Sequence, residues 1–347
     1  MAGAPEIAVV VGDYSRRRYL PFALRSLAAQ TLPRGRFEIV VTKNWHDPTI
    51  DRSLEDLGAR VLFDEETRIG RWLRRAVSAA RAPIVTFLDD DDEYEPGRLA
   101  RILEVFSAHP DLGFYRNRVR VIDRYGRPTP PAAWRAHEVD AAFDTLGPVY
   151  LEPGETARTF DLAARRTHIT FNSSTMAIRR ELLEGALGDD FSEGQLPDLS
   201  LFLAGVLSHR ALFLDDQRLT RFRYYRDSVT HETPWLGRAE SSFRAAAGSA
   251  RRHDRPDFAR WLEEMAVHYG RMYRGSELVE RIVARGPRRE VAQRTAEYLR
   301  LLGRHPTERA WTLDTWAAAG YGLAYLGVPT LTAQLAHRRL RARGLSA

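Results

Sequence analysis

The sequence contains no cysteine and only one lysine, Lys43. The lack of cysteine excludes disulfides and thiolate-bound metals, and it leaves the redox compartment undetermined. All the other basic residues among the 52 are arginines, whose planar guanidinium group binds phosphates and carboxylates bidentately. The arginines are spread along the chain rather than gathered in one run, which argues against a nucleic-acid-binding protein.

The N-terminal stretch MAGAPEIAVVVGDYS lacks the basic segment and long apolar segment of a signal peptide. Over the whole chain, 44% hydrophobic and 28% charged residues are typical of a soluble globular protein, and 347 residues suffice for one or two domains. We therefore expect a cytoplasmic protein, with a peripheral position at the inner face of a membrane as the alternative.

The first 125 residues alternate strand-like and helix-like patterns. Short apolar, β-branched runs predict strands, and apolar residues at helical spacing predict helices between them. The predicted strands are 7–11, 37–42, 59–63 and 84–88, and the predicted helices are 19–30, 71–82 and 96–109. This alternation predicts an α/β domain with a mainly parallel sheet, which binds its ligands beyond the carboxyl ends of the strands.

The fourth predicted strand ends in four aspartates, in the stretch TFLDDDDEYEP from Thr86 to Pro96. Adjacent carboxylates repel one another unless solvent, hydrogen-bond donors or a cation offsets their charge. In an extended segment, Asp89 and Asp91 would face one side, and Asp90 and Asp92 the other. The run is either a solvated turn or, as its place after a buried strand favours, a site for a divalent metal or a nucleotide.

Three stretches together resemble the family 2 glycosyltransferases of the GT-A fold: IAVVVGDYSRRRYLPFALRSLAAQ, the strand FEIVV, and FLDDDDEYEPGRL. The resemblance is strong over residues 5–110 and weaker to about 230. It implies the nucleotide-diphospho-sugar transferase fold, with a mainly parallel mixed sheet. Lys43-Asn44, in place of the usual acidic pair, and Asp51 downstream look like an archaeal-type variant.

The resemblance also implies a nucleotide-diphospho-sugar donor and a Mg²⁺ or Mn²⁺ cofactor. Asp91 and Asp92 are expected to hold the metal, and Asp89 to face the nucleoside side of the donor. The full set of donor-binding residues that the resemblance suggests is Asp13, Tyr14, Arg16, Asn44, Gly70, Arg74, Asp89 and Arg226. Arg75 is the alternative to Arg74.

A sugar transferase also needs a base that takes the proton of the acceptor hydroxyl. The family carries this carboxylate at the start of a helix in the second half of its catalytic domain. Asp198, in Phe191…Pro197-Asp198-Leu199, occupies the matching place and is the predicted catalytic base. The alternative is that Asp198 only caps the helix that begins near Leu199.

Residues 1–232 are the predicted GT-A catalytic domain, and 233–347 a helical C-terminal extension. Thr315 to Ala336 contains no Asp, Glu, Lys or Arg, and HRRLRARG follows it. Three interpretations are open: helices packed on the catalytic domain, a peripheral membrane contact, or a spanning or partner-binding segment.

The predicted function is metal-dependent transfer of a sugar from a nucleotide-diphospho-sugar to a hydroxyl of a glycan or lipid-linked acceptor. Inversion at the anomeric carbon follows from the resemblance. The alternatives are a non-catalytic relative that binds nucleotide sugars or glycans, and a nucleotidyltransferase. A nucleotidyltransferase usually has a glycine-rich basic loop after the first strand, and GDYSRRR has only one glycine.

Overall fold

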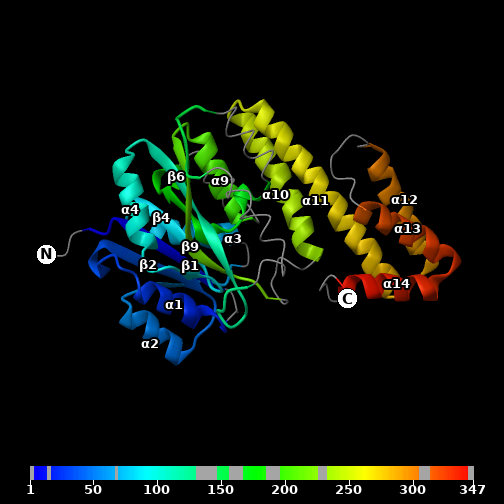
Figure 1. The fold of residues 1–347 in the computed structure, drawn as a ribbon, viewed down its shortest axis with the longest axis horizontal. Helices are drawn as coiled ribbons and strands as arrows, with labels where there is room; N and C mark the ends of the chain where they lie inside the picture. Colours follow the sequence, from blue (N-terminus) through cyan, green and yellow to red (C-terminus); the bar gives the residue numbers. More distant parts are fainter. Residues whose placement is uncertain are drawn as a thin grey trace. The chain divides into compact units, whose positions relative to one another are not determined.

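The computed structural model of the protein describes residues 4–13, 17–66, 69–129, 147–155, 167–184, 196–225, 233–304 and 313–342 (Figure 1). Its strands form one mixed sheet in the order β3-β2-β1-β4-β8-β6-β9-β5, with β7 paired to β9. The strands are β1 Ile7–Asp13, β2 Phe37–Lys43, β3 Arg60–Phe63, β4 Ile84–Asp89, β5 Glu93–Tyr94, β6 Leu112–Ile122, β7 Val149–Leu151, β8 Met176–Arg179 and β9 Ala211–Arg223.

The first half of the sheet is parallel, as the alternating pattern predicts. In this half β1 lies between β2 and β4, so that Gly12 is level with both Thr42 and Asp89. The carboxyl ends of these three strands therefore meet at one edge of the sheet. In the second half, β8 is antiparallel to both β4 and β6, while β6 and β9 are parallel.

Helices cover both faces of this sheet. The helices of this part are α1 Leu20–Ala28, α2 Pro48–Asp56, α3 Ile69–Ala79, α4 Arg98–Ala108, α7 Glu181–Glu184 and α9 Pro197–Leu207. Apolar residues of α1, α2 and α4 share one core with alternate residues of β1 and β2, such as Val9 and Ile39. On the opposite face, Trp72 of α3 packs against Gly12, and α9 packs against Phe114 of β6.

Three details of the chain differ from the sequence expectation. The sequence of residues 168–179 predicts one or two strands, whereas the segment forms two short 3₁₀ turns, Thr167–Thr170 and Ser173–Thr175, before the four-residue strand β8. The sequence also predicts two short strands at 211–215 and 219–225, whereas the structure has one strand, β9, which continues through Asp216 to Arg218. Helix α2 was not predicted, although Asp47 caps it through the backbone N–H groups of Thr49 and Ile50, with Pro48 at its first turn.

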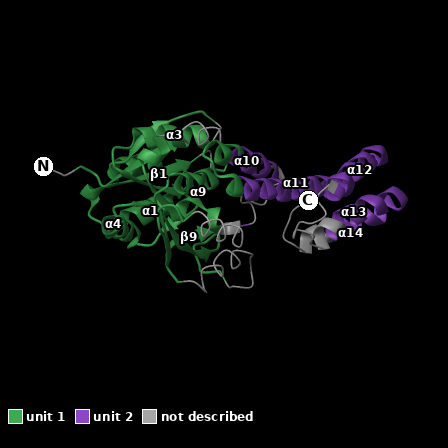
Figure 2. Ribbon diagram, turned by 90° about the horizontal axis from the view of Figure 1, so that it is seen from above, with its two compact units in different colours: residues 1–224, 248–258 green, residues 225–247, 259–347 purple. Residues whose placement is uncertain are grey.

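The chain divides into two compact units, each described here by itself (Figure 2). Residues 1–224 and 248–258 form the sheet-containing unit, and residues 225–247 and 259–347 form the second unit. The predicted catalytic-domain boundary at residue 232 stays a prediction. The remaining helices are α10 Thr233–Arg252, α11 Pro256–Val283, α12 Arg288–Arg304, α13 Leu313–Gly327 and α14 Pro329–Ala342.

The uncharged stretch from Thr315 to Ala336 does not form a single helix, because α13 ends at Gly327 and α14 starts at Pro329. Proline fits the first turn of a helix and ends a preceding one, which explains the break. Across the described residues, no helix has both the length and the apolar character needed to cross a membrane.

We predict that Ile102→Ala in α4 lowers the free energy of unfolding by about 3 kcal/mol, since it leaves a cavity in the core between α4 and the sheet. Ile102 is fully buried, whereas Ile69 at the start of α3 is 37% exposed. Ile69→Ala is therefore the matched control, with an expected loss below about 1 kcal/mol. Chemical denaturation of both variants tests the assignment, and equal losses would contradict it.

Candidate functional site

The four aspartates form a tight turn at the end of β4, which we call the carboxylate turn (Asp89–Asp92). The backbone N–H of Asp92 donates to the carbonyl oxygen of Asp89 at 3.1 Å. This bond curls the chain, so that carboxylate oxygens of Asp89, Asp91 and Asp92 lie within 4.8 Å of one another. The extended-strand expectation, which put Asp92 on the side away from Asp89 and Asp91, is therefore wrong.

Arg223, the last residue of β9, holds the carboxylate turn from one side. Its backbone N–H donates to Oδ1 of Asp92 at 3.0 Å, and its Nε donates to the carbonyl oxygen of Asp91 at 2.8 Å. Its guanidinium group also donates to a carboxylate oxygen of Glu93 and, at 3.1 Å, to the carbonyl oxygen of Asp123. The guanidinium is buried over the rings of Tyr19 and Phe22. Because its donors are engaged by protein acceptors, Arg223 serves as a support for the turn.

The segment Asn172–Ser174, which we call the NSS segment, holds the turn from the other side. The Ser173 hydroxyl donates to Oδ1 of Asp89 at 2.9 Å, and the backbone N–H of Asp89 donates to Oγ of Ser174 at 3.0 Å. The side-chain amide of Asn172 donates to Oδ2 of Asp92 at 2.8 Å. These contacts fix the directions of two of the three clustered carboxylates.

The electrostatics of the cluster favour a cation. Burial raises the pKa of Asp92 well above its ordinary value, and the nearby charges of Asp91 and Asp89 raise it further. A divalent cation among the three carboxylates would oppose this mutual repulsion, and oxygen ligands of this kind suit Mg²⁺ and Mn²⁺. The three clustered carboxylates thus fit the metal that the sequence implies.

Asp90 does not belong to the cluster and is fully buried. Its place outside the expected metal and donor ligands predicts that Asp90 tolerates alanine better than its neighbours. Its burial argues against this expectation, because removal of a buried side chain leaves its surroundings unfilled and its partners unpaired.

Asp198 lies in the first turn of α9, directly after Pro197. Its Oδ2 accepts the backbone N–H of Asn172 at 3.1 Å, and its Oδ1 accepts the backbone N–H of Leu199 at 3.1 Å. Burial raises the pKa of Asp198 to about 6, although these N–H groups and the charge of Arg116 act in the opposite direction. A carboxylate with such a pKa is ionised at neutral pH and still takes up a proton readily.

Asn172 connects the two acidic groups of the site. Its side chain donates to Asp92 and its backbone N–H to Asp198. Its backbone has φ 69° and ψ 100°, a left-handed conformation that non-glycine residues seldom adopt and in which asparagine is several-fold enriched. This unusual backbone lets one residue reach both carboxylates, so the structure joins the carboxylate turn and Asp198 in one site.

The expected donor residues near β1 are only partly described. Asp13, the last residue of β1, is buried at the edge of the sheet where β2 and β4 also end. The indole of Trp72 crosses the neighbouring Gly12, and a Cβ on Gly12 would lie 1.7 Å from Cη2 of that ring. Tyr14 and Arg16 lie outside the described residues, as does Arg226.

The side chain of Lys43, the last residue of β2, pairs within the protein rather than with the carboxylate turn. Its ammonium group is paired with the carboxylate of Asp51 and lies 4.7 Å from the ring centroid of Trp45. Only 2% of the Lys43 side chain is exposed, and its hydrogen bond, together with its charge, keeps the pKa of Asp51 below the ordinary value. Lys43 is thus engaged in a buried ion pair within the protein, and the expected donor residue Asn44, which follows it, is half-buried.

The structure does not bring Arg74 to the carboxylate turn. Arg74 is exposed and borders a small hollow shared with Leu183 and Glu184 of α7. Helix α7 follows the end of β8, and Arg179 at that end pairs with Ile84, the first residue of β4. Arg74 therefore lies toward the opposite edge of the sheet from Asp89. The alternative, Arg75, forms an ion pair with Asp64 at 2.8 Å. Gly70 is buried in the first turn of α3.

Sequence reasoning linked Asn172 and Ser173 to the acceptor side only through the family resemblance, and it did not identify Arg223 and Trp72 as parts of the site. The polar run Asn-Ser-Ser directly before a buried strand was a usable signal, because polar loop residues held by a rigid strand often belong to a binding or catalytic site. Arg223 gave no signal, since nothing in the sequence separates it from the many other arginines.

Comparison with known proteins places this site in a family. The family model described as "Glycosyl transferase family 2" matches residues 8–186, about half of the chain. The chain belongs to glycosyl transferase family 2. The match covers the carboxylate turn and the NSS segment, and it ends before Asp198.

Two curated relatives are similar to this family 2 chain. An uncharacterized glycosyltransferase of Nostoc sp., alr2836, is 28% identical over 186 residues, which are 52% of each chain. An uncharacterized glycosyltransferase of Haemophilus influenzae is 26% identical over 110 residues, 31% of this chain and 37% of that protein. The chain thus spans about half, or less, of the length of the curated relatives it matches.

Solved structures extend the likeness to nearly the whole chain. S. aureus TarS 1-349, solved in complex with UDP-GlcNAc, has a TM-score of 0.57 and 15% identity, with 96% of this chain and 92% of that chain covered. The mannosyltransferase PcManGT of Pyrobaculum calidifontis, solved with GDP-Man and Mn²⁺, has a TM-score of 0.51 and 15% identity, with coverages of 96% and 87%. These likenesses confirm the GT-A fold expected from the sequence.

We predict that the stability of the parent protein falls between about pH 4 and pH 6, and that Asp198→Asn abolishes this fall. The folded-state pKa of Asp198, about 6, lies above the ordinary value of 3.8. Folding therefore favours the protonated form, and stability is lost as the pH rises from about 4 to about 6. This loss should amount to about 2 kcal/mol in the parent, a value reduced for partial exposure, and be absent in the variant, whose amide does not ionise and lacks one N–H acceptor at every pH.

Chemical denaturation across this pH range measures the difference. Asp216→Asn, which removes an exposed carboxylate of β9, is the control for loss of one negative charge. A difference between Asp198→Asn and the parent that does not change with pH would contradict the raised pKa.

Proposed function

We propose that the protein transfers a sugar from a nucleotide-diphospho-sugar to an acceptor hydroxyl. The observation that carries the proposal is the joining of the carboxylate turn and Asp198 through Asn172. One acidic group is clustered for a cation, and the other, held apart from the cluster, has a pKa suited to proton transfer. Membership of family 2 supports the reaction class.

In this proposal Asp89, Asp91 and Asp92 hold the metal, and Asp89 also faces the donor's nucleoside. Bound Mg²⁺ or Mn²⁺ supplies positive charge that stabilises the diphosphate leaving group. The Mn²⁺ complex of the mannosyltransferase neighbour is consistent with this assignment. Arg223 and the NSS segment keep the carboxylates in place, so the site is organised before the donor binds.

Asp198 is the proposed base. Its carboxylate takes the proton of the acceptor hydroxyl while the hydroxyl oxygen forms a bond to the anomeric carbon. The bond from that carbon to the diphosphate oxygen breaks in the same step, and the nucleoside diphosphate leaves with its electron pair. Attack from the face opposite the leaving group inverts the anomeric centre. We further propose that this reaction takes place in the cytoplasm.

The alternative of a non-catalytic relative keeps the donor site without a working base. The raised pKa of Asp198 favours the enzyme, because a carboxylate that only capped α9 would be stabilised in its charged form at the helix N-terminus. The nucleotidyltransferase alternative is disfavoured by the family match.

Two variants separate metal binding from proton transfer. We predict that Mn²⁺ together with nucleoside diphosphates raises the melting temperature of the parent, and that Asp91→Asn abolishes this shift because it removes one of the three clustered carboxylates. Asp198→Asn should retain the shift while its transfer rate falls by about 10²–10⁴-fold, the usual contribution of a general base. Thermal shift and a transfer assay measure both quantities on each variant.

Asp216→Asn, with an exposed carboxylate outside the cluster, is the matched control and should behave as the parent in both assays. Retention of the metal-dependent shift in Asp91→Asn would refute the metal site. Transfer by Asp198→Asn near the parent rate would refute the base without affecting the metal assignment.

We also predict that Asn172→Ala lowers Mn²⁺ affinity and the transfer rate by about 10–100-fold each, the usual effect of losing a residue that orients metal ligands. Asn172→Gly distinguishes the two functions of this residue. Glycine adopts the left-handed backbone freely but lacks the amide that donates to Asp92. Glycine should therefore weaken Mn²⁺ binding as alanine does, with a smaller loss of stability, and parent-like Mn²⁺ binding by both variants would contradict the bridge.

A further inference from the structure

The second unit carries an exposed apolar surface on α13 and α14, which we call the hairpin face (Leu323, Val328, Leu331 and Leu335). These side chains are 56%, 56%, 53% and 47% exposed. On α14, the helical spacing of Leu331 and Leu335 places them on one side of the helix, and Arg338 lies on the same side. The opposite side, with Ala333 and Ala336, is buried in the core of the unit.

The solvent side of a helix in a water-soluble protein normally carries charges. Here the exposed residues of both helices from Gly320 to Leu335 are all uncharged. They are Gly320, Leu323, Ala324, Gly327, Val328, Thr330, Leu331, Gln334 and Leu335. Large apolar side chains that are about half exposed, on a stretch whose exposed residues are all uncharged, mark a surface for a partner rather than for water.

The sequence that contains and follows the hairpin face carries charge of one sign. No Asp or Glu occurs from Thr315 to Ala347, and four arginines, Arg338, Arg339, Arg341 and Arg343, follow the exposed leucines. A second copy of this chain, docked face to face, would bring the exposed Arg338 of each copy together without acidic partners from the same segment. The charge therefore favours an anionic partner over self-association.

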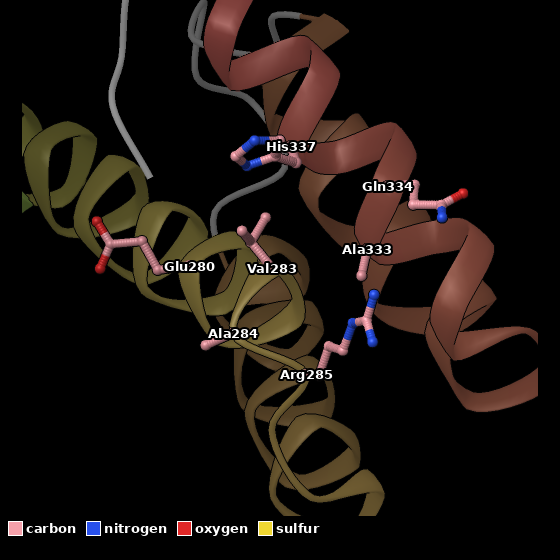
Figure 3. A pocket seen from close by; sticks show the side chains of 7 residues that line it. All are labelled: Glu280, Val283, Ala284, Arg285, Ala333, Gln334 and His337. Atoms are coloured by element: carbon pink, nitrogen blue, oxygen red, sulfur yellow. The ribbon is translucent and has the colours of Figure 1, made fainter.

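A hollow beside α14 is lined by side chains that can donate hydrogen bonds. It has a volume of about 590 Å³ and lies between the end of α11 and α14, where Arg285 and His337 line it together with Gln334 and Ala333 (Figure 3). Glu280 is its one acidic lining residue, and Figure 3 shows its carboxylate directed away from Arg285. The hollow thus offers hydrogen-bond donors next to the hairpin face.

We propose that the hairpin face binds the surface of an anionic lipid membrane. The leucines would enter the boundary between headgroups and acyl chains, while the arginines contact lipid phosphates. Arginine is suited to this place because its apolar stem stays among the chains while its guanidinium reaches the phosphate. This inference stands independently of the sugar transfer proposed above.

The test is sedimentation of the full chain with vesicles of phosphatidylcholine alone and of phosphatidylcholine mixed with phosphatidylglycerol. We expect binding to the mixed vesicles and at least tenfold weaker binding to the neutral ones. Each arginine at an anionic surface adds about fivefold to binding. Replacement of Arg338, Arg339, Arg341 and Arg343 by glutamine should therefore reduce binding to the mixed vesicles by more than tenfold.

Leu331→Ser/Leu335→Ser should reduce binding by about tenfold or more, because the inserted apolar surface is lost. Val61→Ser/Met272→Ser is the matched control, since these residues are 40% and 38% exposed but lie outside the hairpin face. The leucine positions are exposed, so the variants should fold, which circular dichroism and the melting temperature verify.

Three results would overturn the proposal: no binding to either vesicle, equal binding to neutral and anionic vesicles, or equal losses in the leucine variant and its control. Light scattering of the same proteins in solution tests whether a second copy of the chain, instead of a membrane, covers the hairpin face. A parent dimer that Leu331→Ser/Leu335→Ser converts to monomer would assign the hairpin face to a second copy of the chain.

Discussion

The site depends on holding three carboxylates of one turn within reach of a single ion. Without support, the repulsion among Asp89, Asp91 and Asp92 would open the turn or keep protons on it. The protein opposes this with donors from two distant parts of the chain, Arg223 and the NSS segment. The rest of the sheet can be understood as the frame that brings those donors to the end of β4.

The mixed second half of the sheet makes this possible. The short strand β8 is antiparallel to β4, so the chain just before β8 arrives at the carboxyl end of β4. Strand β9 is also antiparallel to β5, which follows the turn directly, and it ends at Arg223 beside the turn. A purely parallel sheet would connect neighbouring strands through helices and would not deliver these two segments so directly.

Much of the first half of the fold could be predicted from sequence, because buried parallel strands such as Ile7–Asp13 are continuous apolar runs with helices of clear periodicity between them. The carboxylate turn was found for the same reason. The partners of the turn were not, since Asn172 and Arg223 reach it through tertiary contacts across 80 and more residues. The buried contacts of Lys43 with Asp51 and Trp45 were likewise not predicted from the sequence.

The two acidic groups differ in environment more than in chemistry. Asp92 is buried among other carboxylates, so its charge is favourable only when a cation is near. Asp198 stands at the start of a helix with two N–H donors, yet burial still holds its pKa near 6. Environments that separate the properties of two aspartates in this way assign different roles to them. Because Asn172 contacts both, a displacement of Asp92 by a bound metal would be passed to the backbone N–H that Asp198 accepts. Metal binding and the basicity of Asp198 are therefore expected to be coupled through this one residue.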